Sequence, residues 1–342
     1  MVKIGINGFG RIGRAIFKIN QKHNYFEIVH VNDIDPDLKN MIYLLKNDST
    51  YGKYDKDVRY IDDNHFSIDG MKISYSAEDY IENVDWNGAD LVICATGIKE
   101  NVNGAKKLIE KSIIKKAVVT HSSKIVDNTI IMGVNESKYN HEEDHLVSSS
   151  ICDANAVAQA LNHIDKQWGI KNCFFTTLHP WLSYQNLVDG TLKSVSSPGH
   201  YWKDYALGRS ASESMIPKLT TAASAVIDVL PELKNKIDAI SFRTPTAIVS
   251  SSDMTITCKK NITENEVKQY FSKIADKNNF MAYNEESLIS IDYKQIEESS
   301  IIDGQWIKVL DNNVLKIVLW YDNEWGYSAS ALNVAKLITK NL

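Results

Sequence analysis

Three glycines lie between a strand-like and a helix-like segment at the start of the chain, and this arrangement constrains the fold more than any other feature. Residues 2–7 are rich in β-branched side chains, as in a short buried strand. The glycines follow at once, and the apolar residues after them recur at helical spacing. Such a turn brings backbone amides and the positive end of a helix dipole to a pyrophosphate. The segment therefore predicts a dinucleotide-binding unit, whose expected cofactor-binding residues are Gly8, Phe9, Gly10, Arg11, Ile12 and Gly13.

An acidic residue stands at the end of the next predicted strand. Residues 26–31 form that strand, and Asp33 follows Gly13 by 20 residues. A carboxylate at this place accepts hydrogen bonds from the adenosine ribose and repels the 2′-phosphate of NADP. NAD is the predicted cofactor, because the strand, the glycines, the helix, the second strand and the acid follow one another in this order. The alternative is that the glycines form only a structural strand-to-helix turn.

The pattern of strands and helices changes about halfway along the chain. In the first half, apolar strands at 90–96 and 117–120 flank a helix-like segment at 103–111, which indicates a doubly wound parallel sheet. Thr96 and Gly97 end the first of these strands, so we expect them beside the cofactor. In the second half, longer strand-like segments with few helices lie at 172–179, 239–244 and 252–258. The predicted fold class is α/β, a parallel Rossmann sheet plus a second α+β catalytic domain with a mainly antiparallel sheet.

Composition excludes several other classes of protein. A net charge of −5 over 342 residues is not that of a general nucleic-acid binder. No apolar run approaches the ~20 residues of a membrane span, and Met1 leads directly into a strand without a secretory leader. The cysteines are far apart and the histidines lack ligand spacing, so we expect no metal site and a reducing, cytoplasmic location. The cysteines are Cys94, Cys152, Cys173 and Cys258.

One cysteine and one histidine are candidates for catalysis. Cys152 stands at the start of a predicted helix, where the helix dipole stabilises a thiolate. His179 ends a predicted strand and could project toward the same cleft, and an adjacent histidine lowers a thiol pKa further. Core packing is the alternative explanation for both residues.

Four motifs resemble signatures of the glyceraldehyde-3-phosphate dehydrogenase family. They read NGFGRIGR at 7–14, MGVN at 132–135, FRTPT at 242–246 and WYDNEWG at 320–326. The resemblance covers essentially the entire chain. It implies an NAD-binding Rossmann domain at 1–151 and 322–342, a catalytic domain at 152–321, and a homotetramer.

The resemblance also implies roles for individual residues. Cys152 matches the nucleophile that attacks an aldehyde, and His179 matches its base. Asn155 matches a companion asparagine, and Asn323 matches the residue that holds the nicotinamide carboxamide. A thioester then forms and is cleaved by phosphate or water. The expected substrate-binding residues are Asn155, Thr220, Arg209 and Arg243.

The chain departs from the family where phosphate would bind. The usual string Ser-Cys-Thr-Thr-Asn is here Ile151-Cys-Asp153-Ala-Asn155, and Leu182 replaces a threonine three residues after the histidine. Asp153 would repel a phosphate and raise the Cys152 pKa, or else it is an acid that faces solvent.

These departures leave several functions open. The chain is expected to oxidise a small, phosphorylated aldehyde such as glyceraldehyde 3-phosphate. The alternatives are an erythrose-4-phosphate dehydrogenase-like enzyme, a non-phosphorylating aldehyde dehydrogenase, and a catalytically silent NAD-binding scaffold. A cysteine peptidase would leave the glycine turn and Asp33 unexplained.

Overall fold

The computed structural model describes residues 1–191 and 204–342, which divide into two compact units. Met1–Ile151 and Ser328–Leu342 form the first unit, and Cys152–Tyr327 form the second. The second unit therefore extends beyond the expected boundary at 321. Asp322 ties the residues after 321 to the second unit, because its Oδ2 accepts a hydrogen bond from the Gln295 amide at 2.9 Å. In the part of the chain that is described, no helix is both long and apolar enough to cross a membrane.

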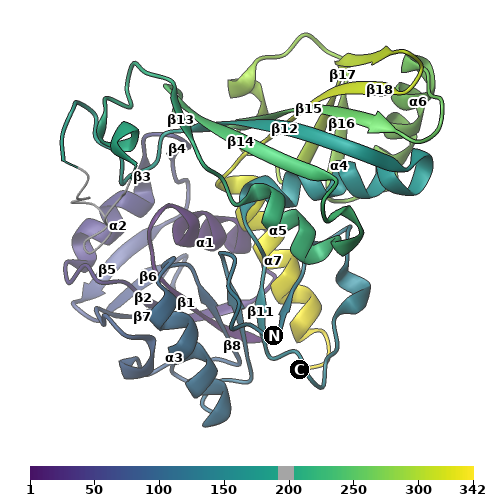
Figure 1. The fold of residues 1–342 in the computed structure, drawn as a ribbon. Helices are drawn as coiled ribbons and strands as arrows, with labels where there is room; N and C mark the ends of the chain where they lie inside the picture. Colours follow the sequence, from purple (N-terminus) through teal and green to yellow (C-terminus); the bar gives the residue numbers. More distant parts are fainter. Residues whose placement is uncertain (192–203) are drawn as a thin grey trace. The chain divides into compact units, whose positions relative to one another are not determined.

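The first unit is built on a nine-stranded sheet (Figure 1). The strand order is β10-β11-β9-β8-β1-β2-β7-β6-β5, and all neighbours are parallel except β7-β6-β5. The strands are β1 Lys3–Asn7, β2 Glu27–Asn32, β5 Val58–Asp62, β6 His65–Ile68, β7 Met71–Ser76, β8 Leu91–Cys94, β9 Lys116–Val119, β10 Asn128–Thr129 and β11 Leu146–Ser148. The helices are α1 Arg11–His23, α2 Leu38–Lys46, α3 Lys99–Glu110 and the C-terminal α7 Trp325–Thr339, and β3 Asn47–Asp48 pairs with β4 Gly52–Lys53.

The central strands of this sheet are buried along their whole length. All residues of β8 and β9 are buried, as is expected of parallel strands that helices cover on both faces. Helix α1 ends at Asn24, whose left-handed backbone (φ 54°) lets its amide bond the Asn20 carbonyl. The prediction of a doubly wound, mostly parallel sheet is confirmed.

The second unit contains a seven-stranded sheet in the order β13-β14-β12-β15-β18-β17-β16. Four of its strand pairs are antiparallel, whereas β12–β14 and β16–β17 are parallel, so the predicted α+β architecture is confirmed with a mixed sheet. The strands are β12 Ile170–Pro180, β13 Ile216–Lys218, β14 Ile237–Thr244, β15 Ser250–Cys258, β16 Met281–Asn284, β17 Ser300–Leu310 and β18 Val314–Tyr321. The helices are α4 Cys152–Trp168, α5 Ala222–Val229 and α6 Glu264–Ala275.

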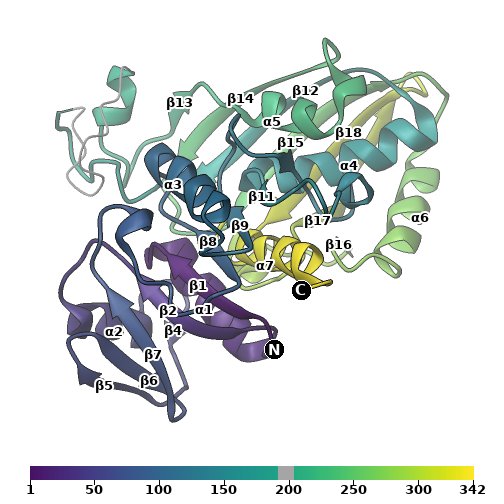
Figure 2. The same cartoon turned by 90° about the horizontal axis from the view of Figure 1, so that it is seen from below.

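Helix α4 begins at Cys152 and packs on this sheet. It packs on β12, β15, β17 and β18 and contacts α5, so both helices cover the same face of the sheet (Figures 1 and 2). Its apolar side chains, including Val157 and Leu161, are fully buried. The packing fixes the first turn of α4, which carries Cys152, over the strands that lie beneath it.

Candidate active site

The glycine turn after β1 has the shape that a pyrophosphate requires. Gly8 has φ +95°, and a Cβ there would lie 2.9 Å from the Thr96 nitrogen. A Cβ on Gly13 would collide with the Gly8 carbonyl oxygen, so α1 approaches the turn as closely as backbones permit. Gly10 instead has no heavy atom within 4 Å of a Cβ position. Two glycines are thus needed by the fold, and the third leaves room for a ligand to approach the backbone.

Asp33 lies one residue beyond β2 and is held against this turn. Its Oδ2 accepts a hydrogen bond from the Phe9 amide at 2.5 Å. Arg11 and Ile12 form the first turn of α1, and the Arg11 guanidinium donates to Asp48 at 2.8 Å. The Arg11 side chain therefore anchors the β3–β4 segment. The glycines and the fixed carboxylate fit the pyrophosphate and ribose of a dinucleotide.

Two further predicted cofactor positions follow β8. The Thr96 hydroxyl accepts a hydrogen bond from the Ile98 amide at 3.2 Å, and Gly97 has φ +70°. Both residues thus shape the short connection between β8 and α3.

Asn323, between β18 and α7, is 5% exposed. Among the described residues, its Oδ1 has no hydrogen-bond partner. A buried acceptor without a donor costs about 1–3 kcal/mol, so this atom suits a ligand N–H such as that of a carboxamide.

Cys152 is the first residue of α4 and its side chain is only partly exposed. The chain enters the helix through Ser150, whose left-handed backbone (φ 61°) is uncommon for a residue other than glycine. Non-glycine residues in this conformation concentrate at functional sites. The turn brings the thiol to the N-terminal end of α4.

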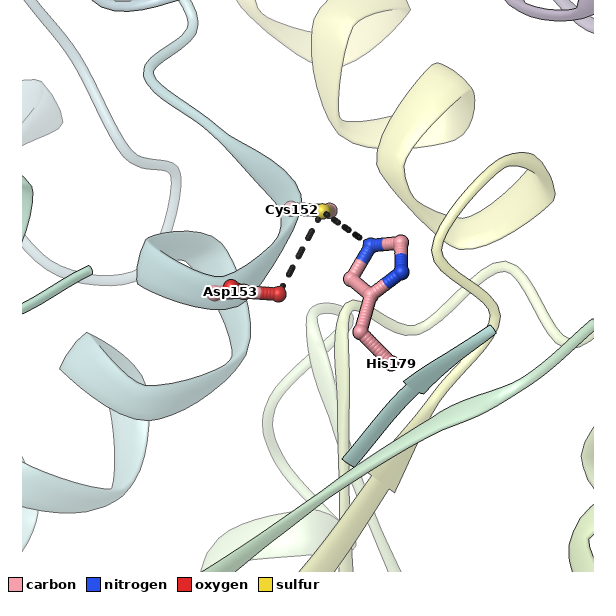
Figure 3. Close-up of side chains that lie close together, drawn as sticks. All are labelled: Cys152, Asp153 and His179. Carbon is pink, nitrogen blue, oxygen red and sulfur yellow. Dashed lines mark hydrogen bonds between the residues drawn. The ribbon is translucent and has the colours of Figure 1, made fainter. Parts of the chain in front are cut away.

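His179 faces this thiol from the end of β12. The Cys152 Sγ lies 3.6 Å from His179 Nε2, and the imidazole is 5% exposed (Figure 3). His179 Nδ1 lies 2.8 Å from the Pro180 carbonyl oxygen, which can only accept a hydrogen bond. The proton of the neutral ring is therefore assigned to Nδ1. This leaves the Nε2 lone pair directed at the sulfur.

Asp153 forms the third member of this group. The Cys152 thiol donates to Asp153 Oδ1 at 3.5 Å, and the Tyr321 hydroxyl donates to the same oxygen at 2.7 Å. The Asp153 side chain is 6% exposed. The interpretation of Asp153 as an acid that faces solvent is therefore wrong. Asp153 is instead buried within the second unit, where its carboxylate contacts the thiol.

Burial and nearby charges shift the pKa of both members of the pair. Burial first, and then the Asp153 carboxylate, raises the pKa of Cys152 well above its ordinary value, and Arg243 opposes this only weakly. Burial first, and then Arg243, lowers the pKa of His179 to about 4. Desolvation and the adjacent carboxylate therefore oppose the effect of the helix dipole on the thiol, which is the direction expected of Asp153. Both shifts favour the uncharged forms of Cys152 and His179.

Two cations lie on the same face of the sheet as His179. Arg243 pairs with His179 across β14 and β12, is 6% exposed, and donates to the Tyr184 hydroxyl at 2.8 Å. Within the described residues, its Nε has no acceptor. Ile216 of β13 pairs with Arg243, so Lys218, two positions along β13, points to the same face.

Lys218 belongs to the electrostatic surroundings of the thiol. Burial first, and then Arg243, lowers the pKa of Lys218, whereas Asp153 and Cys152 raise it. No sequence pattern singles out Lys218, since only the strand register places it near these groups.

The other predicted substrate residues differ in their surroundings. Asn155 is fully buried on α4, one turn from Cys152. The Thr220 hydroxyl accepts a hydrogen bond from the Ala222 amide at 3.1 Å and so stabilises the start of α5. Arg209 is exposed, and its Nε donates to Asp189 at 2.8 Å. Of the two predicted arginines, therefore, Arg243 is the one that the fold brings beside His179.

Comparison with family models assigns both halves of the chain. Residues 2–102 match the model described as "Glyceraldehyde 3-phosphate dehydrogenase, NAD binding domain", and residues 151–323 match "Glyceraldehyde 3-phosphate dehydrogenase, C-terminal domain". Together with the glycine turn and the fixed Asp33, these matches define an NAD-dependent oxidoreductase with a separate catalytic domain. NAD is therefore the cofactor of this class.

Similar proteins extend the match to nearly the full length. The chain is 37% identical to a glyceraldehyde-3-phosphate dehydrogenase of Geobacillus stearothermophilus, with 98% of both chains covered. It is 38% identical to that of Salmonella typhimurium, with 99% of both covered. It is 37% identical to glyceraldehyde-3-phosphate dehydrogenase 1 of Kluyveromyces lactis, over 98% of this chain and 99% of that relative. The chain belongs to the glyceraldehyde-3-phosphate dehydrogenase family.

Proposed function

We propose that this protein oxidises a small phosphorylated aldehyde, such as glyceraldehyde 3-phosphate, through a covalent intermediate on Cys152. The observation that carries the proposal is the contact of 3.6 Å between the Cys152 sulfur and His179 Nε2. A nucleophile and a base with its tautomer fixed are the parts that thiol-based acyl chemistry needs. The relatives named above bear the name of this activity, which supports the same substrate.

His179 acts as the base during attack. As the sulfur bonds to the aldehyde carbon, the thiol proton moves to Nε2 and the carbonyl π electrons move to oxygen. The hydrogen bond from Nδ1 to the Pro180 carbonyl stabilises the imidazolium that results. The oxygen of the thiohemiacetal is held by the Cys152 amide and by His179. Because the resting thiol is protonated, deprotonation accompanies the attack on the substrate.

The second half of the reaction regenerates the thiol. NAD, when bound, supplies the acceptor for the hydride that leaves the thiohemiacetal carbon, and Cys152 is then a thioester. Phosphate or water adds to the acyl carbon, the carbon–sulfur bond breaks, and the sulfur leaves as a thiolate. Proton return through His179 restores the starting state. Asn323, with its buried Oδ1, is proposed to orient the carboxamide of the cofactor.

Arg243 and Lys218 are proposed to bind the substrate's phosphate. Arg243 is a buried cation whose Nε has no acceptor within residues 1–191 and 204–342, and Lys218 is a half-buried cation close to it. Unpaired buried cations are costly, and a phosphate dianion compensates that cost. Lys218 thereby offers a charged donor in place of the hydroxyl that Leu182 lacks. We include Asn155 and Thr220 in this pocket by resemblance.

A second function is favoured by the choice of acyl acceptor, which is either phosphate or water. Asp153 is buried beside the thiol, and its charge repels an incoming phosphate dianion. Water carries no such penalty. A non-phosphorylating dehydrogenase is therefore the second candidate. An enzyme similar to erythrose-4-phosphate dehydrogenase is a form of this second candidate that oxidises a longer aldehyde.

Steady-state formation of NADH tests these proposals. The protein is first treated with a chelator so that no metal ion is bound to the thiol. Glyceraldehyde 3-phosphate and erythrose 4-phosphate are compared, each with and without inorganic phosphate. Turnover that depends on phosphate supports the phosphorylating function, and turnover that does not depend on it supports hydrolysis of the thioester. No NADH from either aldehyde, with NAD bound, refutes the enzymatic proposal and leaves the scaffold.

We also propose a homo-oligomer in the cytoplasm, a tetramer by resemblance. Phe174 and Ile240, on adjacent strands β12 and β14, are 69% and 55% exposed. Ile240 pairs with Thr176, two residues from Phe174, so both side chains share the sheet face opposite α4. Exposed apolar groups on a sheet face favour association. Light scattering after gel filtration measures the mass, and a monomer of 342 residues would contradict the proposal.

A further inference from the structure

Three different metal-ligating atoms meet at the candidate active site. Cys152 Sγ, a carboxylate oxygen of Asp153 and a ring nitrogen of His179 all lie within 4.8 Å of one another. Two come from the first turn of α4 and one from the end of β12, and Figure 3 shows the sulfur in contact with both the Asp153 carboxylate and the His179 imidazole. No motif in the sequence spaces these residues as ligands, because the histidine arrives from a different element.

Two of their three separations are those of a tetrahedral zinc site. Zinc binds sulfur at about 2.3 Å, imidazole nitrogen at about 2.0–2.1 Å and carboxylate oxygen at about 2.0–2.2 Å. With tetrahedral angles, these lengths place sulfur about 3.5–3.6 Å from both the nitrogen and the oxygen. In the structure, sulfur lies 3.6 Å from Nε2 and 3.5 Å from Oδ1. Two edges of the tetrahedron are therefore present, and the third, between the imidazole nitrogen and the carboxylate oxygen, lies within 4.8 Å and closes when the metal binds.

The surroundings hold two of the ligands in orientation. His179 Nδ1–H donates to the Pro180 carbonyl, so Nε2 is the free, unprotonated nitrogen. Tyr321 donates a hydrogen bond to Asp153 Oδ1 and fixes the carboxylate. Such outer hydrogen bonds orient ligands and strengthen metal binding. Cys152 as a residue is partly exposed, and water is the fourth ligand that this site requires.

We propose that Cys152, Asp153 and His179 bind Zn²⁺ as a three-ligand site, and that the bound metal reversibly blocks the nucleophile. Binding releases the thiol proton to solvent while the sulfur–zinc bond forms, and no electron is transferred. Thiolate and carboxylate together balance the two charges of the metal, whereas Lys218 and Arg243 oppose it. The blocking half of this inference rests on the proposed function; the binding half does not.

Titration of the full-length, chelator-treated protein with Zn²⁺ tests the binding. Calorimetry in two buffers with different heats of ionisation is expected to give one zinc per chain with release of protons. Co²⁺ is expected to give a thiolate-to-metal charge-transfer absorption. Asp153→Asn, which keeps an acceptor for Tyr321, is expected to weaken zinc binding about tenfold or more. Cys152→Ser is expected to abolish the cobalt absorption, even if the Asp153 variant folds poorly.

Matched control variants lie on the same helix. His163→Gln and Asp165→Asn alter α4 residues that do not belong to the cluster, and zinc affinity is expected to remain within about twofold of that of the unmodified protein. If these controls weaken binding as much as Asp153→Asn does, or if no zinc binds, the site is refuted.

A separate readout addresses the block. Zinc is expected to protect Cys152 from iodoacetamide, whether or not an aldehyde is turned over. Zinc that binds without protecting the thiol overturns the blocking half. Failure of the proposed function appears differently, as absence of NADH formation in the metal-free protein.

Discussion

Replacing Asp153 with Asn removes a buried negative charge that contacts the nucleophilic thiol. The Asn amide oxygen keeps an acceptor for the Tyr321 hydroxyl, so the packing of the site is expected to persist. A carboxylate disfavours the thiolate, and its removal therefore lowers the pKa of Cys152. A lower thiol pKa means more thiolate at pH 7. The variant is accordingly expected to react faster with an electrophile than the unmodified protein does.

The distance between the two groups sets the magnitude. Sulfur and Oδ1 are 3.5 Å apart. At an effective dielectric constant of about 20, unit charges at that separation repel by about 5 kcal/mol, more than a thousandfold in the thiolate equilibrium. Nucleophilicity falls with the pKa, so about half of the logarithmic gain survives in the rate, or about fiftyfold at most. Lys218 and Arg243 partly neutralise Asp153, and we expect a rate increase of about tenfold to fiftyfold.

Alkylation by iodoacetamide at pH 7 with a chelator present measures this rate. Mass spectrometry of the Cys152 peptide separates it from the three buried cysteines, Cys94, Cys173 and Cys258. Burial raises the pKa of Cys94 and Cys173 to about 12 and that of Cys258 to about 11, so they react slowly. The control is Asp165→Asn on the same helix, about 18 Å along α4. Asp165 accepts a hydrogen bond from the Ile170 amide, which Asn preserves.

An alkylation rate in Asp153→Asn that equals or falls below that of the unmodified protein would refute the electrostatic reasoning. The comparison is valid when both proteins unfold at similar temperatures. An equal acceleration in Asp165→Asn would show that the effect does not come from proximity to the thiol.

Three further predictions concern His179, the glycine turn and Lys218. The folded-state pKa of His179 is about 4, below the ordinary 6.5, so the unfolded chain binds this proton first and stability falls as pH drops from about 6.5 to 4. Between these pH values, the free energy of unfolding of His179→Gln, measured with urea, is expected to fall by about 3 kcal/mol less than that of the unmodified protein. An identical pH dependence in both proteins would contradict the assignment. Gly13→Ala is expected to lose about 1–3 kcal/mol of stability through its collision with the Gly8 carbonyl. Gly10→Ala, with open space around its Cβ, should unfold normally but bind NAD about tenfold or more weakly by calorimetry, and equal effects of the two changes on unfolding would refute this distinction. Lys218→Ser should lower kcat/KM for glyceraldehyde 3-phosphate about tenfold to hundredfold and leave unphosphorylated glyceraldehyde nearly unaffected, and a uniform loss for both aldehydes would count against phosphate binding.

Local features of the chain determined much of the fold. The glycines, the β-branched run before them and the apolar stripe after them predict β1 and α1, because each depends on neighbours within a few residues. The start of α4 at Cys152 was predictable for the same reason. The glycine turn and Asp33 predicted NAD in the same way, and family motifs along the chain implied the roles of Cys152 and His179.

Tertiary structure alone decided the properties of the site. His179 and Lys218 reach the thiol across paired strands, and sequence separation carries no record of strand register. The direction of the Cys152 pKa depends on how much water burial removes and on which way Asp153 turns. Helix position predicted a thiolate, but desolvation together with a carboxylate at 3.5 Å favours the thiol. These quantities arise from packing between distant segments, so they exist only once the chain has folded.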